Sequence, residues 1–388
     1  PAVRISRAGR FSEKHIRRSR RVSCGGDEMK GLRKFLSPFT PDISGASAAL
    51  YELGGIIVIA DAGGCTGNVC GFDEPRWFSQ KSAVFSAGLR DMDAILGRDD
   101  RFMRKIEDAA AQIDASFIAV VGTPVPAVIA MDYRAITRIE EKNTGLPVIT
   151  VDSTGMALYD KGQEKAYCAL FDRFSSRGGG ESFVGVLGAT PLDIPANDSG
   201  RHLAEALGGA EKARLYGMRG TLDDIRHAGD AEKNIVVSPS GFKAARMLKE
   251  KFGTPYEAFY PTDGFDPGKF LAGRSGRRIL VIHQQVFANA LRDKLRETGL
   301  CEKSDVASWF IMDDEIAESG DVRLVEEDDL LRAASDGGYD LIIGDPLFKR
   351  ALRGWNGEFA PLPHFAVSGC LRAAESEEKF WGGLYEKL

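Results

Sequence analysis

Residues 61–77 carry the densest group of chemically active side chains in this sequence. They read DAGGCTGNVCGFDEPRW and follow directly on the apolar run GGIIVIA. Cys65 and Cys70 lie five positions apart among four glycines, with two acids shortly after them. Thiols placed in this way could bind a metal, form a redox pair or only pack in a tight turn.

The spacing of these cysteines excludes the commonest motifs. Four residues separate Cys65 from Cys70, whereas thioredoxin-type and zinc-ribbon pairs have two, and a zinc site would need two further close ligands. As small buried hydrophobes the cysteines would have no chemical role. Iron–sulfur clusters take thiolates, normally four, from distant loops or from two subunits. Cys24, in the polar stretch SCGGDE, is a second loop cysteine, so a cluster shared across a dimer interface is consistent with the sequence.

The glycines of the same stretch do not form a nucleotide motif. Gly63, Gly64 and Gly67 are spaced GGCTG rather than GxGxxG, and the Walker pattern GxxxxGK[ST] is absent from the sequence. Binding of a nicotinamide or of ATP by this chain is therefore unsupported.

Four residues are candidate proton donors: Asp61, Asp73, Glu74 and His364. For the acids in DEPRW, the alternative is a helix start, with Pro75 in the first turn and Arg76 in a nearby salt bridge. For His364, in PLPHFAVSG, the alternative is a structural histidine.

Composition limits the class of protein. A chain of 388 residues is too long for one ordinary core and predicts two or three domains. Its net charge of -5, with mixed signs, argues against nucleic acid and membrane surfaces as partners and favours small molecules or proteins. The arginine-rich N-terminus has no apolar core of signal-peptide length, and no run approaches ~20 apolar residues. With six scattered cysteines, we expect a cytoplasmic protein.

Short β-branched runs alternate with stretches of helical period, which predicts α/β units around parallel sheets. The expected strands cover 56–60, 117–121, 148–151, 183–188, 213–218, 234–238, 279–283, 307–312 and 340–344. The expected crossover helices include RFMRKIEDAAAQI, SGRHLAEALG and FANALRDKLRETG.

Two glycine-rich stretches, RFSSRGGGES and YPTDGFDPGKFLAGRSG, look like linkers. They predict three Rossmann-like domains. The first, 1–176, would hold the basic arm and the cluster, the second would be 177–272, and the third, 273–388, would end in a C-terminal helix. Ligands in such sheets gather at the carboxyl ends of strands, where Cys65, Gly122, Asp152 and Ser238 are expected.

Several segments, in order from about residue 24 to 365, together resemble the nitrogenase component 1 type oxidoreductases. The matching stretches are FTPDISGASAALYELGGIIVIADAGGCTGN, SAGLRDMDAILG, FIAVVGTPVPAVIAMD, LPVITVDSTG, VGVLGATPLD, NIVVSPSGFKAARMLKEKFGTPY and YDLIIGDPLFKRAL. The resemblance implies three Rossmann-like domains, paired subunits with a cluster near their interface, and electrons from a separate P-loop ATPase that carries its own iron–sulfur cluster.

The resemblance also implies which residues bind the cluster, although this sequence departs from the family's pattern in two respects. Cys24 and Cys65 match the family's first two cluster cysteines, whereas the third position falls at Gly122, Thr123 and Pro124. A four-iron cluster held by Cys24 and Cys65 of two subunits, or completed by Cys70, is then expected, with Gly64 and Gly67 closing the backbone around it. The cysteine that anchors the molybdenum–iron cofactor would fall near Ser238, and a histidine before the cluster cysteine is here Asp61.

We therefore expect the substrate-reducing component of an ATP-dependent, nitrogenase-like reductase whose substrate is not dinitrogen. Two alternatives remain open at this point. One is a non-enzymatic scaffold for assembly of a cluster or metallocofactor, and the other is a cluster-free binding protein that kept the fold. The substrate, and whether the chain pairs with itself or with a homologous subunit, are not encoded in a recognisable motif.

Overall fold

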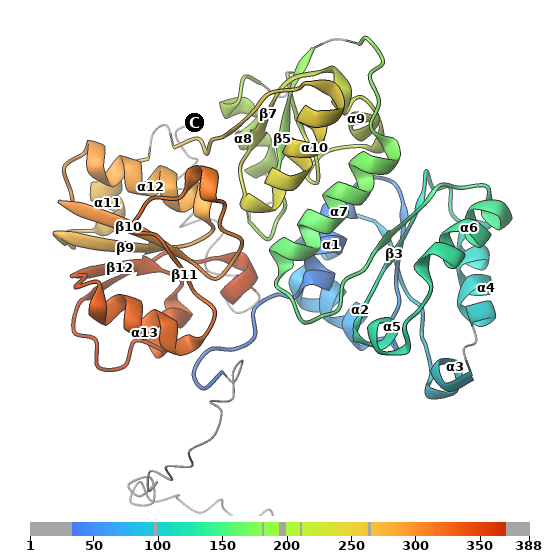
Figure 1. The fold of residues 1–388 in the computed structure, drawn as a ribbon, viewed down its shortest axis with the longest axis horizontal. Coiled ribbons are helices and arrows are strands. Elements are labelled where there is room, and N and C mark those ends of the chain that lie inside the picture. Colours follow the sequence, from blue (N-terminus) through green and yellow to red (C-terminus); the bar gives the residue numbers. More distant parts are fainter. Residues whose placement is uncertain are drawn as a thin grey trace, which may run out of the picture. The chain divides into compact units, whose positions relative to one another are not determined.

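The computed structural model describes residues 33–96, 99–180, 182–193, 199–209, 212–262 and 265–369. Residues from Arg33 onward form one compact unit, which contains all the elements below (Figure 1). Cys24, the basic arm and the expected C-terminal helix lie outside the described residues.

The first sheet is parallel, with strand order β2-β1-β3-β4. Its two central strands, IIVI and IAVV, are buried throughout, as expected for a parallel sheet covered on both faces. The strands are β1 (Ile56–Ile59), β2 (Ala83–Ser86), β3 (Ile118–Val121) and β4 (Val148–Val151). The helices of this part are α1 (Asp42–Leu50), α2 (Gly64–Asn68), α3 (Asp91–Leu96), α4 (Asp99–Ala110), α5 (Pro124–Ile129) and α6 (Tyr133–Thr144).

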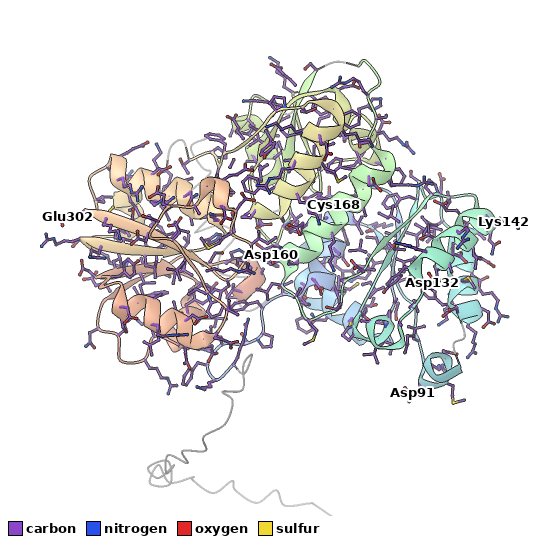
Figure 2. All side chains as sticks on the ribbon, in the orientation of Figure 1. Asp91, Asp132, Lys142, Asp160, Cys168 and Glu302 are labelled. Atoms are coloured by element: carbon purple, nitrogen blue, oxygen red, sulfur yellow. The ribbon has the colours of Figure 1, made fainter. Side chains whose placement is uncertain are left out.

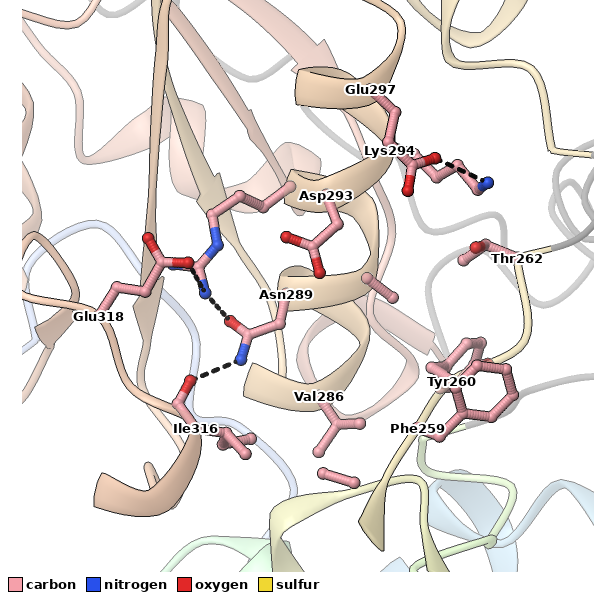
Figure 3. A pocket seen from close by; sticks show the side chains of 13 residues that line it. Phe259, Tyr260, Thr262, Val286, Asn289, Asp293, Lys294, Glu297, Ile316 and Glu318 are labelled. Carbon is pink, nitrogen blue, oxygen red and sulfur yellow. Dashed lines mark hydrogen bonds and ion pairs between the residues drawn. The ribbon is translucent and has the colours of Figure 1, made fainter.

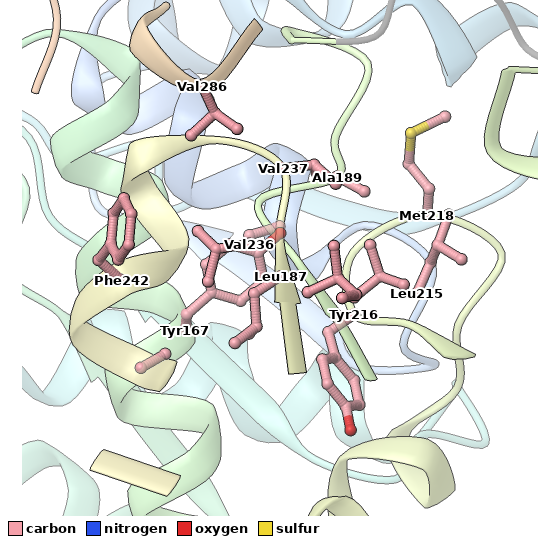
Figure 4. Packing of buried hydrophobic residues seen from close by; sticks show 14 of the residues in the cluster. Tyr167, Leu187, Ala189, Leu215, Tyr216, Met218, Val236, Val237, Phe242 and Val286 are labelled. Carbon is pink, nitrogen blue, oxygen red and sulfur yellow. The ribbon is translucent and has the colours of Figure 1, made fainter. Parts of the chain in front are cut away.

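The second sheet is also parallel, in the order β6-β5-β7-β8. Its strands are β5 (Phe183–Leu187), β6 (Ala213–Leu215), β7 (Ala231–Val236) and β8 (Tyr256–Ala258). The accompanying helices are α7 (Tyr159–Phe174), α8 (Ser199–Ala206), α9 (Leu222–Arg226) and α10 (Phe242–Phe252). Aromatic side chains of α7 and β6, among them Tyr167 and Tyr216, pack with Leu187 and Val236 of the sheet (Figure 4).

The third sheet has five parallel strands in the order β11-β10-β9-β12-β13. They are β9 (Arg278–Ile282), β10 (Lys303–Ser308), β11 (Val322–Arg323), β12 (Leu341–Gly344) and β13 (Glu358–Pro361), with helices α11 (Pro267–Leu271), α12 (Gln285–Glu297) and α13 (Glu327–Asp336). Short 3-10 helices cover Pro75–Phe78, Ala228–Asp230, Pro239–Gly241, Asp314–Ile316 and Pro346–Arg350, and Val69–Asp73 is a π-helix.

The expected α/β class with three parallel, Rossmann-like sheets is thus confirmed. The domain boundaries at 176/177 and 272/273 remain predictions. None of the helices in the described part of the chain is long and apolar enough to cross a membrane.

The sequence-based assignment of strands was wrong at the sheet edges. Strands β2, β8, β11 and β13 were not expected, and all four are edge strands, which are short and only partly buried. The strand expected at 307–312 lies at Lys303–Ser308 instead. The bulky residues that follow it, including Trp309 and Phe310, do not extend the strand but pack in an apolar cluster with side chains of β9, β10 and β12.

Two glycines allow α1 and α7 to pack with their backbones in contact. A Cβ on Gly45 would lie 1.8 Å from the carbonyl oxygen of Tyr159, and one on Gly162 would lie 1.8 Å from that of Asp42. Any larger residue at either position would force the helices apart. Helix α7 also contacts β4 of the first sheet and α9 and α10 beside the second sheet, so the packing of α1 on α7 joins the parts built on the two sheets.

Arg76 adds a polar connection at the same junction. Its guanidinium is 1% exposed and donates to both carboxylate oxygens of Glu74, to Glu52 and to the carbonyl oxygens of Ala48 and Gly217. Gly217 follows β6 of the second sheet, so one side chain holds α1, the segment after the cysteines and the second sheet together.

Replacing Arg76 with Met should lower the free energy of unfolding by about 3–5 kcal/mol, because it leaves Glu74 buried without a cation. Urea denaturation of the two proteins measures this difference. The control is Arg104→Met, which breaks an exposed pair with Asp100 and should cost less than about 1 kcal/mol. Equal losses in the two variants would contradict the role given to Arg76.

Candidate functional site

The cysteine loop begins where β1 ends. Gly63 has φ 117°, a left-handed conformation that favours glycine, and it is the N-cap of α2. The helix starts at Gly64, so Cys65 lies in its first turn, at the carboxyl end of a central strand as expected. This is the edge of a parallel sheet at which ligands commonly bind.

Asp61 fixes the conformation of this loop. One carboxylate oxygen accepts from the backbone N–H of Thr66 (2.8 Å), and the other accepts from the hydroxyls of Thr66 (3.0 Å) and Ser86 (2.6 Å). Ser86 ends β2, so Asp61 ties the loop to the neighbouring strand. The carboxylate is buried, and its role as a proton donor stays a prediction.

Three glycines leave one side of the loop bare. Gly64, Gly67 and Gly71 recur at helical spacing, and a Cβ built on any of them meets no other atom within 4 Å. A bulky inorganic group could therefore approach the backbone closely on this side. The space beside the loop fits the iron–sulfur cluster that the sequence predicts there, and Gly64 and Gly67 stay predicted as cofactor-contacting residues.

The two cysteines differ in access. Cys65 is half-buried, whereas Cys70 is 9% exposed and lies in the π-helix, a local irregularity often found at functional sites. Burial raises the pKa of Cys65, and Asp61 adds to the shift. Burial, with Glu74 and Asp61, raises the pKa of Cys70 to about 11. Both thiols are therefore protonated in the free protein, and metal binding would have to displace these protons.

The position of the family's third cysteine cannot hold a ligand in this chain. A Cβ on Gly122 would lie 2.4 Å from the hydroxyl oxygen of Tyr133 and 2.6 Å from the carbonyl oxygen of Ser153. Thr123 is buried and donates to the carbonyl oxygen of Ala60 at 2.7 Å. Within the described ranges, no group of three or more His, Cys, Asp or Glu side chains could hold a metal ion. A cluster at Cys65 therefore needs ligands from elsewhere, such as Cys24 or a second subunit.

Asp73 and Glu74 follow Cys70 but have different surroundings. Asp73 accepts from Ser44 (2.6 Å) and Asn68 (2.7 Å), and burial raises its pKa. Glu74 is the N-cap of the 3-10 helix that Pro75 begins, and it is ion-paired with Arg76 at 2.7 Å. This geometry is the helix start that the sequence DEPRW allows. The proton-donor roles of Asp73 and Glu74 stay predictions.

A buried polar cluster lies where strands of the second and third sheets end. Tyr159 donates to Asp193 at 2.6 Å, and Ser238 donates to the same carboxylate oxygen at 3.0 Å. The Nδ1 atom of His364 accepts from the N–H of Ala366, so its Nε2–H faces the hydroxyl oxygen of Tyr159 at 3.3 Å. Ser238, expected where the family has its cofactor cysteine, is fully occupied by these protein contacts.

Burial controls the charge of this cluster. It lowers the pKa of His364 well below its usual value, and the neighbouring His283, whose ring centroid lies 4.4 Å away, lowers it further. Burial lowers the pKa of His283 to about 3, a shift that the backbone of Pro363 opposes. Burial raises the pKa of Asp193 to about 7. His364 is therefore a neutral hydrogen-bonding group, and its role as a proton donor stays a prediction.

Tyr159 and His283 were missed as members of a site, although His283 ends the predicted strand at 279–283. Asp193 could have been found, because it lies just beyond the predicted strand at 183–188, where ligands gather in parallel sheets. Tyr159 begins a helix and carries no motif, so only the packing of α7 reveals its role.

Two cavities of similar size lie on the surface of this unit. One, of about 460 Å³, is bordered by α12 and the segment after β8 (Figure 3). Its basic groups are already paired, Arg292 with Glu318 at 3.1 Å and Lys294 with Glu297 at 3.0 Å. The other, of about 450 Å³, is bordered by the cysteine loop and includes Asp73. The second cavity is the one that adjoins the predicted chemistry.

Three parallel sheets, with a glycine-faced cysteine loop at a strand end, define the class of this chain as an α/β protein of Rossmann-like sheets. The family model for the nitrogenase component 1 type oxidoreductases matches residues 42–268, which is more than half of the chain. The chain belongs to this family, as the sequence segments predicted.

Known relatives agree with this assignment. The chain is 31% identical over 180 residues to the nitrogenase iron-molybdenum cofactor biosynthesis protein NifE of Clostridium pasteurianum. That alignment covers 44% of this chain and 38% of the relative, so the matched part is well under half of the relative's length. Among solved structures, nitrogenase Cp1 at pH 6.5 superposes with a TM-score of 0.66 at 15% identity, covering 93% of this chain and 95% of that one. A second structure, nitrogenase Cp1 at pH 5, gives 0.57 at 16% identity, with 91% and 82% covered. At these identities the superpositions show the fold alone.

Asp193→Asn should remove the contribution of this one carboxyl to the pH dependence of stability. Because the folded-state pKa of Asp193, about 7, lies above the ordinary value near 4, the native chain loses stability as pH rises between these values and loses no more above them. The free energy of unfolding of the variant, relative to the native chain, should therefore rise across this window, by up to about 1.4 kcal/mol per pH unit. Urea denaturation at several pH values measures it.

The matched control for this prediction is Asp172→Asn, which removes an exposed carboxylate on α7. Its stability relative to the native chain should stay nearly flat with pH. The histidines of the cluster contribute to the pH dependence of stability in all three proteins, and this contribution cancels when the proteins are compared. If the free energy of unfolding of Asp193→Asn relative to the native chain stays flat across this window, the buried, protonated carboxyl is refuted.

Proposed function

We propose that this chain is the iron–sulfur, substrate-reducing component of an ATP-dependent, nitrogenase-like reductase. The observation that carries the proposal is Cys65, a half-buried thiol on a loop with a bare glycine side, at a strand end, in a chain of the nitrogenase component 1 type family. When bound, an iron–sulfur cluster would supply one-electron transfer. ATP would act only on the partner, in agreement with the absence of a Walker motif from this sequence.

The cluster ligands in this proposal are Cys24 and Cys65 from each of two subunits, with Cys70 as a further candidate. Asp61 holds the loop that positions Cys65, and the open space at Gly64 and Gly67 leaves room beside it. The lower exposure of Cys70 and its high pKa favour Cys65 as the principal ligand. A cluster of the four-iron type suits this number of thiolates.

Exposed apolar side chains support a second subunit at this edge of the first sheet. Phe72 is 61%, Val128 84% and Met156 86% exposed, and the three follow β1, β3 and β4 respectively. Large apolar side chains gathered beyond the strand ends of one sheet favour a protein interface. The partner in this position would be a second copy of the chain or a homologous subunit.

Dinitrogen is not the proposed substrate. Serine is a poor ligand for iron compared with a thiolate, and the hydroxyl of Ser238 is already bonded to Asp193. Asp61, where the family usually has histidine, is used to hold the loop. The substrate class would then be a different unsaturated or reducible small molecule.

Cys65→Ala should abolish the brown absorbance and most of the iron of anaerobically purified protein, because no other thiol occupies this position on the loop. Iron analysis and the visible spectrum measure the result. Cys168→Ala is the matched control, since Cys168 lies on α7 (Figure 2) and should leave both unchanged. Unaltered iron content in Cys65→Ala would show that the cluster assignment is wrong.

A second candidate function is a non-enzymatic scaffold for assembly of a cluster or metallocofactor. It is favoured by the likeness to a relative whose name describes cofactor biosynthesis. It is also favoured by the buried polar cluster, in which Ser238 and His364 are bonded to protein groups rather than presented to a ligand.

Anaerobic turnover distinguishes the two candidates. Incubated with a cognate P-loop ATPase reductase, ATP and candidate substrates, the reductase component should consume electrons and form reduced product. A scaffold should instead pass iron to an acceptor protein and reduce none of the substrates. Iron transfer without reduction would overturn the reductase proposal and support the scaffold.

A further inference from the structure

The cavity of about 450 Å³ beside the cysteine loop has a composition that indicates a particular ligand chemistry. Four segments border it: the chain before α1, the end of α2 with the π-helix, the segment after β4 at Gly155, and the segment after His364. Neither Cys65 nor Cys70 lines it. Its volume is in the range of small-molecule sites, about 300–1,000 Å³. The cavity is therefore adjacent to the predicted cluster loop but separate from its thiols.

The acid that faces this cavity is Asp73. One of its oxygens accepts two short hydrogen bonds, from Ser44 and Asn68, whereas the other receives only a long one of 3.4 Å from Thr40. Among the described residues, no basic side chain forms an ion pair with Asp73. The only charged side chain that shifts its pKa is Glu74, which raises it in addition to the larger effect of burial. The carboxylate thus has one under-used oxygen and no counter-charge.

The remaining walls are mainly apolar. They include Phe39, Phe72, Phe365 and Val367, of which Phe72 is 61% exposed. The nearby cation Arg33 stacks on the ring of Phe39 at 3.9 Å and interacts with Glu326 and Glu327. A half-buried carboxylate that is not paired with a cation is unfavourable, and a ligand that supplies the cation with an apolar body would relieve this cost.

We propose that this cavity binds a small organic ammonium ion, with its charged head on the Asp73 oxygen that accepts only the long bond from Thr40, and its apolar body against Phe72 and Phe365. Aromatic rings favour a cation near their faces, which adds to the selectivity for such a ligand. The inference goes beyond the proposed redox function and does not depend on a bound cluster.

The test uses cluster-free full-length protein and two probes of one shape, phenethylammonium and neutral phenethyl alcohol, titrated by ligand-observed NMR. The native chain should bind the ammonium more tightly than the alcohol. Asp73→Asn should weaken binding of the ammonium by about tenfold or more and change that of the alcohol little, because a charge-assisted hydrogen bond is lost. Asp108→Asn, which removes an exposed carboxylate on α4, is the control and should bind both probes as the native chain does.

Phe72→Ser is the second variant, chosen because the side chain is exposed and its loss should not impair folding. It should weaken binding of both probes. If Asp73→Asn fails to fold, unchanged binding by Phe72→Ser overturns the proposal. Three other results would also overturn it. The ammonium could bind Asp73→Asn and Asp108→Asn with equal affinity, the native chain could bind the two probes equally, or the native chain could fail to bind the ammonium. None of these outcomes affects the iron content that tests Cys65.

Discussion

The hydrogen bonds of the buried Arg76 side chain are the interaction on which the arrangement of the site depends. Its guanidinium has five N–H donors, and all five find acceptors on Glu74, Glu52, Ala48 and Gly217. A buried guanidinium with five paired donors requires several segments to be in place together, because each missing acceptor would leave a buried donor unpaired. The same side chain therefore fixes where the segment after Cys70 ends and where the second sheet lies against α1.

Around this fixed point, the cysteine loop is held from both ends. Asp61 ties its beginning to β2, and Glu74, paired with Arg76, ties the segment that follows it. The loop is thus rigid at its supports and bare on its glycine side, a combination that suits a preorganised site for a large group. The negative charges of Asp61 and Glu74 add to burial in making free thiolates unfavourable. Thiolate formation here would therefore be coupled to the binding of positively charged metal.

The buried polar cluster shows a different use of the same fold. Tyr159, Asp193, Ser238 and His364 form a chain of hydrogen bonds where the second and third sheets meet, and the two histidines of the region are kept neutral by burial. In this chain the region connects sheets through hydrogen bonds, and open space lies instead beside the cysteine loop and at Asp73. The chemistry that we propose thus lies at the first sheet, whereas this cluster couples the second and third sheets.

The sequence by itself determined the class of fold, the central strands other than β10, and the position of Cys65 at a strand end. These features depend on local information: β-branched runs of full burial, helical period, and glycines before a helix. The start of the 3-10 helix at DEPRW was equally local, since proline and the preceding acid specify it. Edge strands such as β2 and β13 were not predictable, because their partly exposed residues lack that pattern and pair only when a central strand is present. The partners of Asp193 and Arg76 and the cavity at Asp73 were decided by tertiary structure alone. The hydrogen bond between Arg76 and Gly217, for example, joins residues 141 positions apart. No periodicity in the chain encodes a contact at that separation.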